Sequence, residues 1–113
     1  MSIRLRLDKP WQPLMTETAA RLPGQLGVYQ VADATGAIVY IGQAGARSPF
    51  GLRSELQRQA TERGAGQQFR VEVNMQYRSR WLELLMVHKA DHGSLPPDNE
   101  KNPPINLGRL SPA

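Results

Sequence analysis

The chain has 113 residues and a formal net charge of +4, with 40% apolar and 21% charged residues and no cysteine. This length gives room for one domain with a modest core, and the composition is that of a folded protein rather than a disordered or membrane-embedded one. Without cysteine, disulfides and thiolate zinc sites are excluded. No signal peptide or membrane-spanning run is found, so we expect one domain over residues 1–113, in the cytoplasm and away from membranes.

The basic residues are mostly arginines, eleven of 14. A guanidinium is well shaped for bidentate contact with phosphate, so the excess of arginine favours a nucleic-acid partner. A GC-rich coding genome would produce the same excess, and charge alone does not separate the two interpretations.

The first 26 residues predict an N-terminal extension with two elements. Residues 3–7, IRLRL, alternate apolar and basic side chains, which is typical of an edge strand. Residues 15–22 predict a short helix, because a glutamate lies in its first turn and proline and glycine follow it.

A β-hairpin, two helices and a third strand are predicted next. Residues 27–32 and 37–42 are rich in β-branched and aromatic side chains and flank a four-residue turn. A helix is expected from residue 51 to residue 63, a strand over residues 69–74 and an apolar helix over residues 80–92. Four prolines predict that residues 95–104 form an extended arm. The expected fold class is α+β, with a three-stranded antiparallel sheet flanked by helices.

Two glycines lie inside the predicted hairpin strands, at Gly27 and Gly42. Glycine weakens a strand, so these positions suggest that another group approaches the backbone closely or that the strand bends. The hairpin also brings Tyr29 and Tyr40 near each other on one face. Ordinary packing of paired aromatic rings would explain this pair equally well.

Five elements of the sequence, in their order, resemble the GIY-YIG nuclease superfamily. These are GVY at residues 27–29, YIG at residues 40–42, Arg53 in the following helix, Glu83 in the apolar helix and Asn106 after a proline. The resemblance covers residues 27–106. It implies a metal-dependent endonuclease that hydrolyses phosphodiester bonds in DNA. The resemblance also implies that Tyr29 or Tyr40 activates water and that Arg53 stabilises the phosphate. It further implies that Glu83 holds Mg²⁺ or Mn²⁺ and that Asn106 anchors the site.

Glu83 lies within a run of large apolar residues, where an unpaired carboxylate would be costly. A hard divalent cation would remove that cost and act as a Lewis acid. A salt bridge to Arg53, Arg78 or Arg80 would remove it as well. The histidines at 88 and 92 are one helical turn apart and could bind a transition metal, but a role at the C-terminal end of the helix is the simpler interpretation.

Nucleic-acid contacts are expected from Gln43, Arg47, Arg53 and Arg58. A basic residue often found just after YIG in the resembling family is Gln43 here. This departure leaves open a second function, a catalytically weakened GIY-YIG-derived module that binds nucleic acid and acts with a partner. A domain this small offers little surface for reading bases, so a homodimer or a partner protein is expected to direct it to its target.

Overall fold

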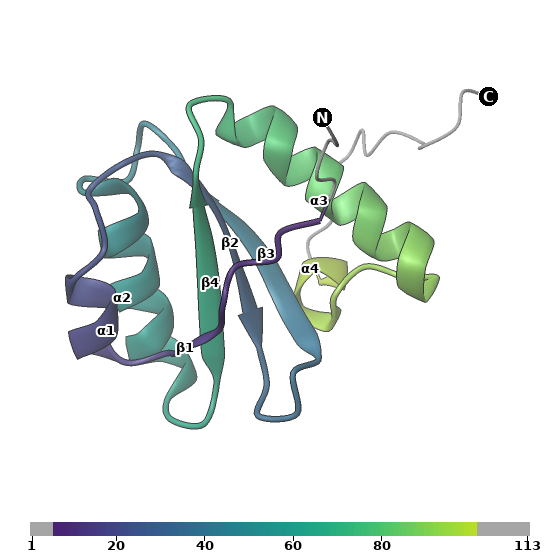
Figure 1. The fold of residues 1–113 in the computed structure, drawn as a ribbon, viewed down its shortest axis with the longest axis horizontal. Helices are drawn as coiled ribbons and strands as arrows, with labels where there is room; N and C mark the ends of the chain where they lie inside the picture. Colours follow the sequence, from purple (N-terminus) through teal and green to yellow (C-terminus); the bar gives the residue numbers. More distant parts are fainter. Residues whose placement is uncertain (1–5, 102–113) are drawn as a thin grey trace.

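The computed structural model describes residues 6–101, which form an antiparallel sheet with helices on both faces (Figure 1). The sheet has four strands in the order β1-β4-β2-β3. Along the chain the elements are β1 (Gln12–Pro13), α1 (Thr16–Ala20), β2 (Gly27–Ala32), β3 (Ile38–Ala44), α2 (Gly51–Arg63), β4 (Gln68–Val73), α3 (Tyr77–His92) and α4 (Pro97–Glu100). The α+β class is confirmed, and the three long strands correspond to the three that the sequence predicts.

The sheet separates two hydrophobic cores. Successive strand residues point to opposite faces, so Tyr29 joins one core and its neighbour Val28 joins the other. The first core lies under α1 and α2 and includes Leu52 and Leu56. The second lies under α3 and includes Leu84 and Leu85. Figure 1 shows α1 and α2 on one side of the sheet and α3 on the other.

The hairpin register sets the positions of the GVY and YIG residues. Tyr29 lies opposite Gly42, and Val31 lies opposite Tyr40. The two tyrosines are therefore on the same face of neighbouring strands, as the sequence predicts, and their ring centroids are 6.0 Å apart.

Both strand glycines allow a close approach, which confirms the prediction made for them. A Cβ atom at Gly42 would lie 2.3 Å from Cζ of Tyr29, and one at Gly27 would lie 2.2 Å from the backbone oxygen of Glu72. Either distance is far below van der Waals contact. These glycines are needed for packing, whatever chemistry the domain performs.

Two predicted elements differ from the structure. The edge strand at residues 3–7 falls partly outside the described residues, and Arg6 and Leu7 are not in a strand. Leu7 instead packs into the second core, and β1 pairs with β4 five residues later. The arm after residue 95 contains the short helix α4, because a proline is tolerated in a first helical turn. Asn106 lies outside the described residues.

Within residues 6–101, no helix is both long and apolar enough to cross a membrane.

Candidate functional site

Tyr29 is fully buried beneath α2, where its hydroxyl has two polar neighbours. The hydroxyl donates to Oε1 of Glu55 over 3.2 Å and accepts from Nε2 of Gln59 over 3.0 Å. Burial raises the pKa of this phenol well above 10.0, and Tyr40 and Glu55 raise it further. Because the phenol stays protonated and away from solvent, Tyr29 is placed to hold α2 on the sheet rather than to accept a proton from water.

Replacing Tyr29 with phenylalanine is expected to lower the free energy of unfolding by about 1–2 kcal/mol, because Gln59 and Glu55 each lose a partner in a buried setting. Urea denaturation measures the change. The control is Tyr40→Phe, since Tyr40 is only partly buried and should lose less. An unchanged midpoint for Tyr29→Phe would contradict the structural role.

Tyr40 lies beside Tyr29 and is accompanied by two arginines of α2. The guanidinium carbon of Arg63 is 5.2 Å from the centre of its ring. Burial raises the pKa of Tyr40, although the charge of Arg58 acts in the opposite direction. Tyr40 is therefore also protonated near neutral pH, and it can donate a hydrogen bond but not act as a base.

The arginines around the tyrosines are already paired with carboxylates. Arg58 contacts Glu55 over 2.8 Å and Glu62 over 3.1 Å, and Arg63 contacts Asp98 over 2.6 Å. Arg58, expected to contact nucleic acid, therefore has its charge largely compensated. The surface around Tyr40 offers little net positive charge to a phosphate.

Arg53 links two parts of the fold. Its Nε donates to the backbone oxygen of Leu22 over 2.9 Å, and its guanidinium carbon is 6.0 Å from the centre of the Phe50 ring. These contacts join α2 to the segment that follows α1. Among the described contacts none joins Arg53 to either tyrosine, so the structure does not assemble the arginine clamp that the resemblance implies.

Glu83 belongs to α3, on the opposite side of the sheet from the face that carries the tyrosines. Its carboxylate pairs with Arg80, which also contacts Glu72 of β4 over 2.9 Å. Burial acts to raise the pKa of Glu72, but the hydrogen bonds and charge of Arg80 outweigh it and hold the pKa below its usual range. Of the salt bridges considered from the sequence, the one to Arg80 is present.

Glu83 as a metal ligand fits poorly with this arrangement. The Glu83 carboxylate already has a cationic partner in Arg80, although Arg80 is shared with Glu72 and its single charge does not balance both carboxylates. The hollow beside Glu83 is also lined by Asn74, Gln76 and Ser79, and no second carboxylate is among its lining residues. We therefore derive no reaction step through a metal here.

Arg47 and Arg78 form what we call the arginine rim. Arg47 lies in the loop between β3 and α2, and Arg78 is the second residue of α3; both are exposed. The two segments touch, because a Cβ at Gly45 would lie 2.8 Å from the ring of Tyr77. Throughout residues 6–101, neither arginine makes a side-chain hydrogen bond or ion pair. The positive end of the α3 dipole adds to their charge.

Gln43 lies near the rim, two residues before Gly45. It is directly opposite Val28, whose side chain packs in the core under α3, so Gln43 is on the α3 face of the sheet. Of the four residues expected to contact nucleic acid, Arg47 belongs to this rim and Gln43 lies near it, whereas Arg53 and Arg58 are on α2. Arg78 was considered in the sequence only as a partner for Glu83.

Along with Gln30 and Gln59, Asn99 is one of three polar residues that are only 4% exposed and that the sequence does not suggest. Its side chain accepts from the Ile41 backbone nitrogen over 2.8 Å and donates to the Ile41 oxygen over 3.0 Å. It therefore takes the place of a neighbouring strand at the outer edge of β3, next to the YIG residues. The proline pair before Asn99 is the one local signal, and this pair predicts an extended arm instead of a helical turn.

Residues 5–91 of the chain match the family model of a domain of unknown function (DUF7508). No curated protein and no solved structure matches significantly.

Proposed function

The chain belongs to the DUF7508 family, and we propose that it is a nucleic-acid-binding module whose arginine rim holds phosphates. This is the second function that the sequence leaves open, a module derived from a GIY-YIG nuclease that no longer cuts. In this proposal the module binds DNA and acts with a partner. The observation that carries it is the state of the two rim arginines. Arg47 and Arg78 are exposed, belong to segments that touch at Gly45 and Tyr77, and have no partner in the described chain.

Contrast with four other arginines supports this choice of surface. A salt bridge with an acidic residue is made by each of Arg6, Arg58, Arg63 and Arg80. Among the described contacts, Arg53 and Arg70 have hydrogen bonds but no salt bridge, and Arg21 is exposed and unpaired like the rim arginines. A guanidinium with a carboxylate partner gains less from a phosphate, because it must give up that partner. An unpaired guanidinium binds a phosphate oxygen and releases counterions from the nucleic acid. The rim is therefore the favoured phosphate contact.

Binding without cutting agrees with the position of the other groups. Burial raises the pKa of both Tyr29 and Tyr40, so neither phenol is a base near neutral pH. Glu83 is paired with Arg80 on the other side of the sheet from the tyrosines. A hydrolytic centre needs these groups around one phosphate, and their separation favours the binding module.

The double substitution Arg47→Gln with Arg78→Gln is expected to weaken binding of a labelled 20-base-pair DNA duplex by about tenfold or more at low salt. Fluorescence anisotropy measures the affinity. The matched control is Arg6→Gln with Arg58→Gln, which removes the same net charge from arginines that are already paired.

Two results would count against the rim. If both double substitutions weaken DNA binding equally, the affinity depends on net charge and not on the rim arginines. No binding by the unaltered protein, even at low salt where phosphate contacts are strongest, would exclude the function.

A metal-dependent endonuclease is the second candidate, favoured by the order of GVY, YIG, Arg53 and Glu83 along the chain. Its test is nicking of a supercoiled plasmid with Mg²⁺ or Mn²⁺. Nicking that is lost in Glu83→Ala and kept in Glu62→Ala, an acidic residue on the surface of α2, would favour the nuclease. Equal background in all three proteins would favour the binding module.

A further inference from the structure

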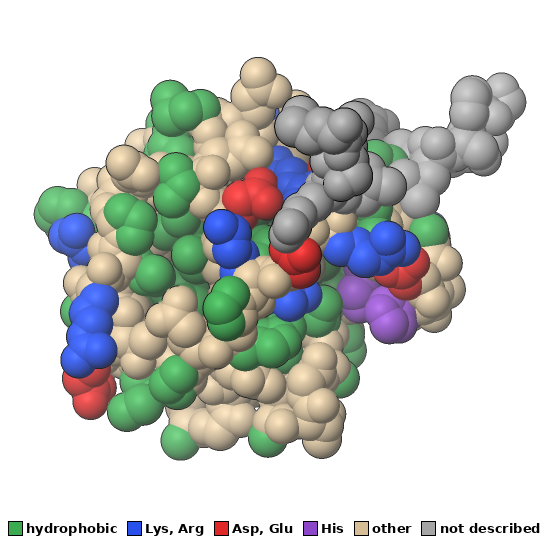
Figure 2. Space-filling model, viewed as in Figure 1, with side chains coloured by type: hydrophobic (Ala, Val, Ile, Leu, Met, Phe, Trp, Pro, Cys, Tyr) green, Lys and Arg blue, Asp and Glu red, His purple; other side chains and the backbone are tan. Residues whose placement is uncertain are grey.

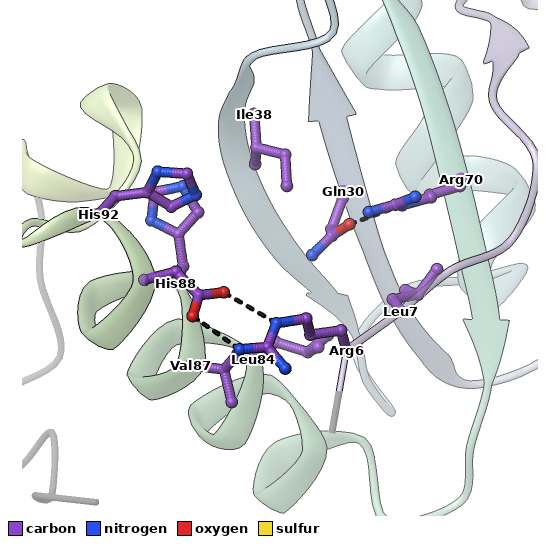
Figure 3. Close-up of a pocket in the computed structure, with 10 residues that line it drawn as sticks. Arg6, Leu7, Gln30, Ile38, Arg70, Leu84, Val87, His88 and His92 are labelled. Atoms are coloured by element: carbon purple, nitrogen blue, oxygen red, sulfur yellow. Dashed lines mark hydrogen bonds and ion pairs between the residues drawn. The ribbon is translucent and has the colours of Figure 1, made fainter. Parts of the chain in front are cut away.

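A cavity of about 200 Å³ lies between the sheet and α3, away from the arginine rim and the tyrosines. Figure 3 shows side chains from β2, β3, β4, α3 and the N-terminal segment surrounding it. An engineered cavity of about 150 Å³ holds benzene, so this one has room for a single ring or short chain with one polar group.

One part of the cavity is apolar. It is lined by four apolar side chains, Leu7, Ile38, Leu84 and Val87. Two of them, Leu7 and Leu84, are each only 2% exposed. The four side chains come from three separate segments, so the wall depends on the folded structure. Such a surface suits the hydrocarbon part of a ligand.

The other part presents hydrogen-bond donors. Gln30 is 4% exposed, and its Oε1 accepts from Nε of Arg70 over 2.7 Å. This bond leaves the side-chain nitrogen of Gln30 for another acceptor, and in Figure 3 it is directed into the space between the sheet and α3. Within residues 6–101, no protein atom accepts a hydrogen bond from it.

Arg70 is the cation beside this amide. It stacks on Trp11 at 4.1 Å, and its Nη1 donates a long hydrogen bond of 3.4 Å to the backbone oxygen of Lys9. Within residues 6–101 it is in no salt bridge. Desolvation lowers its pKa, and the charge of Asp8 offsets this only in part. A half-buried cation with incomplete compensation would gain from an anionic ligand.

The remaining charged groups at the cavity do not replace Arg70. Arg6 and Asp91 form two hydrogen bonds with each other, of 2.9 and 2.7 Å, and so compensate one another. Burial lowers the pKa of His88, which is therefore neutral near neutral pH. Figure 2 shows the two histidines of the chain, in purple, beside basic and acidic side chains at this side of the molecule.

We propose that this cavity is a binding site for a small carboxylate with an apolar body, whose oxygens accept hydrogen bonds from the Gln30 amide and the Arg70 guanidinium. The site is separate from the arginine rim, so its test does not depend on whether the chain binds nucleic acid. A neutral ligand of the same shape would gain less from Arg70.

Benzoate is the probe, and benzamide is its neutral control of matched shape. Two-dimensional ¹H–¹⁵N NMR of the full chain is expected to show that benzoate shifts the Gln30 side-chain amide and the amides of Leu84 and His88. Benzoate should bind about tenfold more tightly than benzamide, since it adds charge-assisted hydrogen bonds.

Two variants test the assigned residues. Gln30→Glu keeps an acceptor for Arg70 but puts a negative charge where the carboxylate would lie, so the benzoate shifts should disappear while the spectrum stays folded. Arg70→Gln should weaken benzoate about tenfold, and Arg58→Gln, with the same charge change elsewhere, should not. The proposal is overturned if benzoate leaves the lining residues unshifted, if benzamide binds as well, or if Gln30→Glu binds benzoate normally.

Discussion

Gly42→Ala is expected to lower the free energy of unfolding by about 3 kcal/mol or more, the upper end of what overpacking a core produces. The new methyl group would lie 2.3 Å from Cζ and 2.4 Å from the hydroxyl oxygen of Tyr29. Tyr29 has little freedom to move aside, because it is fully buried and its hydroxyl is bonded to α2. Either the ring or strand β3 must shift.

Gly24→Ala is the matched control, since a Cβ at Gly24 would have its nearest neighbour at 3.5 Å, an ordinary contact. It should leave stability almost unchanged. Urea denaturation followed by circular dichroism compares the two proteins. Equal stability of Gly42→Ala and the unaltered chain would show that Tyr29 does not lie against this strand.

Asn99→Ala has the second largest expected effect, a loss of about 2–3 kcal/mol. The substitution removes the acceptor of the Ile41 backbone nitrogen and one of two donors to the Ile41 oxygen, which keeps its hydrogen bond from Nε1 of Trp81. Ile41 is fully buried at the edge of the sheet. An unpaired buried amide or carbonyl costs roughly 1–3 kcal/mol each, and water entering the gap would recover part of this.

Lys101→Ala serves as the control for Asn99→Ala, because Lys101 follows the same helix and its side chain is 78% exposed. Thermal unfolding should show a clear fall in Tm for Asn99→Ala and almost none for Lys101→Ala. Hydrogen exchange at Ile41 gives a direct second measurement and should become faster only in Asn99→Ala. Unchanged exchange there would contradict the edge-capping role.

Most of the fold could be predicted because its signals are local. The hairpin strands are rich in β-branched and aromatic residues, the turn between them is short, and the buried leucines of α2 are four residues apart, so composition and spacing identify these elements. The two-residue strand β1 has no period of its own, and it forms only because β4 is there to pair with it. The sequence does not predict the short helix α4, because four nearby prolines are typical of an extended chain. A proline at the first position of a helix is nevertheless tolerated, and α4 begins with one.

Less of the site could be predicted, because its contacts are long-range. The pairing register of β2 and β3 places Tyr29 next to Tyr40, and the hairpin alone is enough to predict this contact. Glu55 and Gln59 meet Tyr29 only because α2 packs on that face, and no local pattern indicates this. Arg80 pairs with Glu83 from three residues away on the same helix, which is ordinary helical geometry and one of the alternatives that the sequence leaves open.

The most direct test of the central claim is the salt dependence of DNA binding. Each phosphate contact contributes a slope of about −0.9 when the logarithm of the association constant is plotted against that of the salt concentration. The slope for Arg47→Gln with Arg78→Gln should therefore be shallower by about two units than that of the unaltered protein, and the slope for Arg6→Gln with Arg58→Gln should be nearly unchanged. Identical slopes for the unaltered protein and the rim variant would contradict phosphate binding at the arginine rim.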